Sequence, residues 1–77
     1  MRFRFTRSSR RHKIGRAHAL AALAAAGQPI VDVKGDLWWI GVDDRGVELE
    51  IIGFVDADDD ALVIIKHVMP TAFRRKR

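Results

Sequence analysis

Three apolar runs separated by short polar turns constrain the fold of this chain more than any other feature. They are "LWWIGV" (37–42), "VELEIIGFV" (47–55) and "ALVIIKHVM" (61–69), and they are rich in Val, Ile and Trp, which favour β-strands. The segments between them, "DDRG" and "DADDD", have the length and composition of turns between antiparallel strands. We therefore predict a three-stranded antiparallel meander within residues 36–69.

The first part of the chain predicts a strand followed by helix. "MRFRFT" alternates Arg with Phe, which is the period-two pattern of a half-buried strand. Ser8 and Ser9 can cap a short helical turn, and Gly27 follows an Ala- and Leu-rich segment, Arg16–Ala26, that predicts a second helix. The order of elements indicates an α+β fold in which one or two N-terminal helices pack on one face of the sheet.

A chain of 77 residues is expected to form one domain. Its parts are a basic strand and helix region (1–27), the meander (36–69) and a basic tail (70–77) that forms a short C-terminal helix. The basic start before an Ala/Leu stretch is also typical of a signal peptide. The stretch is short and contains His18, so we interpret it as part of the fold and expect a cytoplasmic protein with no membrane segment.

Charge is distributed unevenly along the sequence. Residues 1–18 hold seven Arg and Lys and no acid, and residues 74–77 hold four more. The stretch between them, 19–73, holds three basic residues and all ten acids. Two cationic ends predict a polyanionic partner, although frayed basic termini of an ordinary protein explain the same pattern.

The pairing of the first hairpin determines which side chains share a face. If Val42 pairs with Val47, Trp38 joins the apolar face of the sheet. Trp39 then shares the opposite face with Glu50. In the second hairpin we expect Glu50 opposite Lys66, or opposite His67 if the register differs by one residue.

These side chains could cleave RNA without a metal, and no cofactor or metal site is predicted. Glu50 or Glu48 could take the proton of the 2′-hydroxyl, Lys66 could hold the phosphate, and His67 or His12 could protonate the leaving oxygen. Four cations, Arg11, Lys13, Arg74 and Arg75, could bind the RNA backbone, and Trp39 could stack on a base.

Each candidate also has a purely structural explanation. The two glutamates alternate with apolar residues, as on the solvated side of a strand. Lys66 opposite Glu50 could be a plain cross-strand pair, His67 a partly buried histidine and His12 part of a solvated loop. The outward-facing tryptophan could serve a protein interface instead of a nucleotide.

Three segments carry a resemblance to a known family. They are "RRHKIGRAHALAALAA", "DLWWIGVDDRGVELEIIGFV" and "ALVIIKHVMPTAFRRK", and in this order they resemble the BrnT-like toxins of bacterial type II toxin–antitoxin systems. "RHKIG" is similar to the basic entry of the family's helix, with Arg11 and His12 in the Lys-His places. The first helix of the family is longer, and its last strand ends differently from Lys66-His67-Val68-Met69.

The resemblance implies a RelE-like fold and RNA cleavage without a metal. It also implies a cognate antitoxin that binds the toxin in a hetero-oligomer and carries it to operator DNA. His12 and the basic tail match the family best by position, whereas Lys66 and His67 match a functional region. Two alternatives stay open: a basic RNA- or DNA-binding module without catalysis, and an interaction domain that pairs with another chain.

Overall fold

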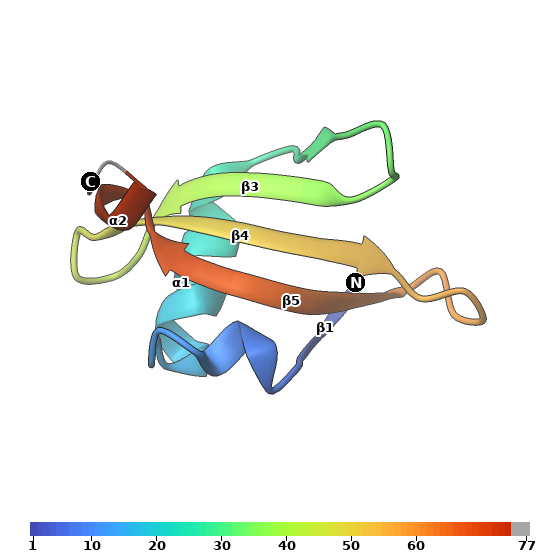
Figure 1. The fold of residues 1–77 in the computed structure, drawn as a ribbon, viewed down its shortest axis with the longest axis horizontal. Coiled ribbons are helices and arrows are strands. Elements are labelled where there is room, and N and C mark those ends of the chain that lie inside the picture. Colours follow the sequence, from blue (N-terminus) through green and yellow to red (C-terminus); the bar gives the residue numbers. More distant parts are fainter. Residues whose placement is uncertain (75–77) are drawn as a thin grey trace.

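The computed structural model describes residues 1–74 and shows a five-stranded sheet with one main helix on one face (Figure 1). The order of strands in the sheet is β1-β5-β4-β3-β2. The elements are β1 (Arg2–Phe5), the 3-10 turn η1 (Ser8–Arg10), α1 (Arg16–Ala26), β2 (Ile30–Val31), β3 (Leu37–Val42), β4 (Glu48–Val55), β5 (Leu62–Pro70) and α2 (Thr71–Arg74). The predicted α+β class is confirmed.

The meander and the main helix are where the sequence predicts them. β3, β4 and β5 follow one another as antiparallel neighbours, and α1 has the predicted bounds, with Gly27 after it at a φ of 75°. The whole sheet is mixed rather than antiparallel, because β1 lies parallel to β5. β2 was not predicted, since two residues are too few to show a period of two.

The first hairpin has a register one residue away from the predicted one. Val42 pairs with Glu48 instead of Val47. The N–H of Asp43 donates to the carbonyl of Val47 at 2.9 Å and so closes a three-residue turn, in which Gly46 has a φ of 82°. The carboxylate of Asp43 holds this turn by accepting the N–H of Val47 at 3.0 Å.

This register exchanges the two tryptophans. The side chain of Trp39 lies in the core with Leu49 and Ile51, and Trp39 is only 4% exposed. Trp38, the next residue along the strand, lies on the opposite face. The prediction that Trp39 faces outward beside Glu50 was therefore wrong.

A β-bulge in the second hairpin decides where the end of β5 points. Ile52 pairs with His67 and Gly53 pairs with Ile65, so Lys66 is an additional residue. A Cβ atom on Gly53 would lie 2.6 Å from a carbonyl oxygen of β5, so only glycine permits this close approach. The bulge leaves His67 on the face opposite to the buried Ile65.

Both predicted pairings of Glu50 were wrong, and the bulge is only part of the reason. Glu50 opposite Lys66 would require Val55 opposite Ala61, but Val55 pairs with Val63, so the register already differs by two residues before the bulge. Glu50 lies opposite Met69, and neither Lys66 nor His67 is its direct partner. An additional residue in one strand moves all later pairings by one position, and the apolar pattern alone does not reveal it.

α1 covers one face of the sheet, and among the helices of residues 1–74 only α2, at one end, lies on the other face (Figure 1). The core between α1 and the sheet consists of nine buried apolar residues: Ala19, Ala22, Leu23, Trp39, Leu49, Ile51, Val63, Ile65 and Val68. We call the side opposite α1 the open face. None of the helices within residues 1–74 has the length and apolarity needed to cross a membrane.

Candidate active site

Glu50 is buried although it lies on the open face of the sheet. The residue is only 3% exposed. Its Oε2 atom accepts a hydrogen bond from Nε2 of His67 at 3.0 Å, and its Oε1 atom accepts one from Nε of Arg74 at 2.8 Å. A second guanidinium nitrogen of Arg74 also contacts Oε1. Both carboxylate oxygens therefore have partners, which offsets the cost of removing the charge from water.

His67 reaches Glu50 diagonally across two strands. Glu50 is paired with Met69, and side chains two positions apart on neighbouring strands are within reach of one another on the same face. A carboxylate only accepts hydrogen bonds, so Nε2 of His67 carries the hydrogen and the neutral ring keeps a lone pair on Nδ1. The His67 side chain is 29% exposed, so this second nitrogen is on a ring that solvent reaches.

His12 comes to the same place from a distant part of the chain. It lies in the loop between η1 and α1, and its ring centre is 6.1 Å from that of His67 and 5.5 Å from that of Phe73 in α2. The structure thus brings together four residues that the sequence analysis singled out separately. We call His12, Glu50, His67 and Arg74 the His–Glu cluster.

Hydrogen bonds from two serines hold the loop of His12 beside β5. Ser8 Oγ donates to the carbonyl of Lys66 at 3.0 Å, at the bulge. Ser9, which is buried, donates its hydroxyl to the carbonyl of Thr6 at 2.6 Å. Lys13 then turns the chain toward α1 with a φ of 58°. Ser8 thus anchors η1 to the sheet, and Ser9 holds the turn to Thr6. The prediction that these serines cap a helical turn was wrong, because both lie inside η1, whose N-cap residue is Arg7 and makes no side-chain capping bond.

Lys66 lies outside the His–Glu cluster. Its Nζ atom is 2.7 Å from Oδ2 of Asp36, which precedes β3. Its charge therefore has a carboxylate partner that the sequence analysis did not consider. Glu48, the other predicted base, is exposed and accepts a hydrogen bond from Oγ1 of Thr71 at 2.7 Å.

Trp38 takes the position that was expected for Trp39. The guanidinium carbon of Arg74 lies 5.9 Å from the centre of the Trp38 ring, and Nε1 of Trp38 donates to Oδ2 of Asp32 at 2.8 Å. This hydrogen bond lowers the pKa of Asp32, partly against the effect of its burial. Two adjacent tryptophans in a strand predict that one ring points into the core and the other points out. Only the register of the hairpin determines that Trp39 is the inward ring and Trp38 the outward one.

The predicted RNA-binding residues are distributed over two elements. Arg11 and Lys13 are exposed on the loop that carries His12, and Arg74 is exposed on α2 beside Glu50. Arg75 lies outside the described residues. Trp39 is enclosed by α1 and the sheet, where a base cannot reach it.

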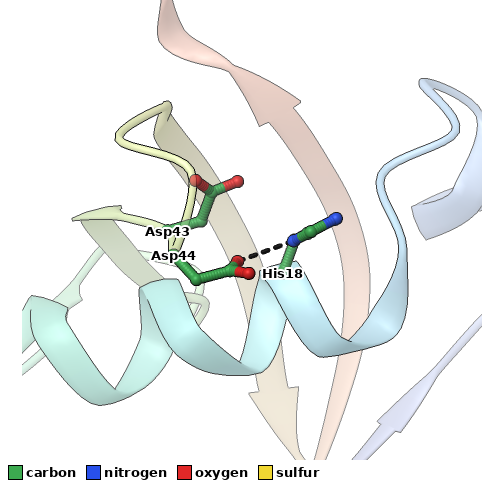
Figure 2. A group of neighbouring side chains, drawn as sticks. All are labelled: His18, Asp43 and Asp44. Atoms are coloured by element: carbon green, nitrogen blue, oxygen red, sulfur yellow. Dashed lines mark hydrogen bonds and ion pairs between the residues drawn. The ribbon is translucent and has the colours of Figure 1, made fainter.

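A second cluster joins α1 to the turn between β3 and β4 (Figure 2). His18, Asp43 and Asp44 offer ligand atoms within 4.8 Å of one another, and Nδ1 of His18 lies 2.6 Å from Oδ1 of Asp44. The oxygens of Asp43 are already occupied, however. Oδ1 accepts a hydrogen bond from the N–H of Val47, and Oδ2 accepts one from Nε of Arg45 at 3.0 Å. The arrangement therefore acts as a clamp between helix and turn.

Electrostatics in this clamp favour the charged form of both aspartates. Burial raises the pKa of Asp43, but hydrogen bonds from Arg45 and from the N–H of Val47 outweigh it, so the pKa lies below its ordinary value. The pKa of Asp44 is also lowered, mainly by the hydrogen bond with His18. Both groups stabilise the fold as carboxylates.

Comparison of the chain with protein-family models, with curated proteins and with solved structures gives no match. The side chains of the His–Glu cluster are therefore the basis for a functional hypothesis.

Proposed function

We propose that this chain is a ribonuclease and the toxin of a type II toxin–antitoxin system, with a RelE-like fold and a cytoplasmic site of action. The observation that carries the proposal is that two histidines lie beside the buried Glu50, which is paired with Arg74. His12 and His67 have ring centres 6.1 Å apart, so one phosphate can lie between a proton acceptor and a proton donor. The basic loop and α2 around them supply charges that attract RNA.

The proposed reaction uses the 2′-hydroxyl of the substrate as nucleophile. Nδ1 of His67 takes the hydroxyl proton while the 2′-oxygen forms a bond to phosphorus. The bond from phosphorus to the 5′-oxygen breaks, and His12 in its charged form donates a proton to that oxygen. The products are a 2′,3′-cyclic phosphate and a 5′-hydroxyl, and each histidine ends with the protonation state that the other had at the start.

Glu50 acts in this proposal as a positioning residue rather than as the base. Its oxygens are engaged by His67 and Arg74 and it is buried, so it orients the imidazole and stabilises the charge that the ring acquires. Arg74 is bonded to the same carboxylate as His67, and its side chain is partly exposed, so its guanidinium can stabilise charge on the phosphate oxygens.

The proposal includes a cognate antitoxin that binds the toxin and links it to operator DNA. Large apolar side chains are exposed on and around β2, where Ile30 and Val31 are 73% and 61% exposed. Ile30 borders a hollow of about 420 Å³ that Trp38 and Ile40 also line. A small protein seldom exposes this much apolar surface at one edge, so a protein partner is expected there.

The direct test is cleavage of a labelled RNA by the purified protein in the presence of a metal chelator. We expect cyclic-phosphate ends, and we expect His67→Ala and His12→Ala each to lower the rate about 10²–10⁴-fold. His18→Ala is the matched control, because His18 is half-buried on α1 and contacts Asp44 instead of the His–Glu cluster.

The same assay distinguishes a ribonuclease from the alternative, a basic nucleic-acid-binding module without catalysis. A basic binding module would retain the labelled RNA in a salt-dependent complex and leave it intact. Intact RNA after incubation with folded wild-type protein at a range of pH values would contradict the ribonuclease proposal. An equal loss of cleavage rate in His12→Ala, His67→Ala and His18→Ala would contradict a specific role of the His–Glu cluster in the reaction.

A further inference from the structure

Two neighbouring hollows beside β1 and the start of α1 are lined with cations. The first, of about 530 Å³, has Arg2, Arg4 and Arg16 in its wall. The second, of about 400 Å³, has Arg10, Lys13 and Arg16 in its wall. Arg16 belongs to both, so the two hollows form one continuous surface that we call the basic track.

Most of these cations have no carboxylate partner within the described residues. Arg2 pairs with Asp59 across the sheet edge. No carboxylate of residues 1–74 lies within ion-pair distance of the other four, which are Arg4, Arg10, Lys13 and Arg16. Among residues 1–74, none of those that line the two hollows is acidic. Unpaired cations gathered around a concave surface attract a polyanion.

The floor of the basic track is apolar and partly aromatic. Phe3, Leu20 and Leu62 line the first hollow, and Phe5 and Ile14 line the second. The guanidinium carbon of Arg16 lies 5.2 Å from the centre of the Phe5 ring. Single-stranded RNA combines phosphates, which cations bind, with unstacked bases, which pack on arginine and aromatic planes. Free phosphate or a lipid headgroup would use only the charges.

The basic track begins next to the His–Glu cluster. Lys13 follows His12 directly in the loop, and the ring of His12 contacts His67. We propose that single-stranded RNA lies along the basic track from His12 toward Arg4, with its phosphates on Lys13 and Arg16. This inference rests on the proposed function, because it describes how the substrate of that site is held.

The test measures binding separately from cleavage. A fluorescent RNA of about 12 nucleotides with 2′-O-methyl groups cannot supply the nucleophile, and its affinity is followed by anisotropy from about 50 to 200 mM salt. Lys13→Gln and Arg16→Gln each remove one proposed phosphate contact. Lys34→Gln is the matched control, because Lys34 is an exposed cation between β2 and β3, at the opposite edge of the sheet.

We expect each variant in the basic track to reduce the slope of log affinity against log salt by about 0.7, and the affinity about 5-fold near 0.1 M salt. Arg16→Lys should restore the slope, because it keeps the charge. Lys34→Gln should match the wild type. Circular dichroism spectra and thermal midpoints of all variants confirm that they are folded.

The outcomes distinguish this inference from the proposed function. The proposal that RNA binds along the basic track would be contradicted if the salt slope is unchanged in Lys13→Gln and Arg16→Gln. An equal change of the slope in Lys34→Gln would also contradict it. Both conclusions hold even if the wild type cleaves RNA. Reduced slopes together with a wild type that does not cleave RNA would support the track and contradict the ribonuclease proposal.

Discussion

Nε2 of His67 lies 3.0 Å from Oε2 of Glu50 on the open face of the sheet, where α2 is the only helix of the described residues and covers one end. Arg74 holds the other oxygen of the same carboxylate. The pair resembles a catalytic dyad in its geometry, since a buried acid fixes the orientation of a partly exposed imidazole and determines which ring nitrogen carries the hydrogen.

Replacement of Glu50 by Gln tests this positioning role. The amide keeps the size of the side chain but carries no charge, so it neither stabilises a charged His67 nor pairs fully with Arg74. We expect kcat for RNA cleavage to fall about 10²-fold with little change in KM. The pH dependence of kcat should change as well, which a purely structural role would not produce. An unchanged pH profile in a folded Glu50→Gln protein would contradict the role of Glu50.

The two tryptophans should differ sharply in their effect on stability. Trp39 is buried in the core, where its ring meets that of Phe3 edge-on at 6.2 Å, and Trp39→Ala should lower the free energy of unfolding by about 3–5 kcal/mol. Trp38→Ala should cost less, because Trp38 is only partly buried. Urea unfolding measures both values. Equal losses would show that the register of the first hairpin is not the one described.

Gly41 lies where the backbone of α1 comes very close to the sheet. A Cβ atom at this position would be 2.2 Å from the carbonyl oxygen of Ala22 and 2.9 Å from Cβ of Ala26. We expect Gly41→Ala to lower the free energy of unfolding by about 1–3 kcal/mol, because the helix must move outward. Gly15→Ala is the control. Its new methyl group would meet its nearest atom at 3.5 Å, so it should cost less than about 1 kcal/mol.

The clamp of Figure 2 predicts how stability responds to acid. The folded-state pKa values of Asp43 and Asp44 lie below the ordinary value of 3.8. A lowered pKa in the folded state contributes stability above the ordinary pKa, and this contribution is lost as the pH falls through the folded value. Thermal unfolding midpoints should therefore drop as the pH falls below about 4.

Asp43→Asn should flatten that pH dependence and lower the midpoint at neutral pH, because an amide cannot replace the charged acceptor of Arg45. The exposed Asp60, in the turn between β4 and β5, supplies the control variant Asp60→Asn, which should follow the wild-type profile more closely. A midpoint of Asp43→Asn equal to that of the wild type near pH 7 would show that the turn does not depend on this carboxylate.

Local patterns were sufficient to find the meander and the main helix, and to select His12, Glu50, His67 and Arg74 as chemically notable. They were insufficient to show that these four residues meet. His12 contacts His67 because Ser8 anchors η1 to the bulge in β5, and this contact joins segments far apart in the sequence. The partner of Lys66, Asp36, was missed for the same reason.

The sequence by itself determined β1, the three strands of the meander, the helix Arg16–Ala26 and the charge of both ends of the chain, because these depend on neighbouring residues. The tertiary structure decided which face each side chain occupies. Asp43 shortens one turn, and the bulge beside Gly53 adds a residue to β5. Each offset is a single residue, and a side-chain period of two in a strand converts such an offset into the opposite face of the sheet.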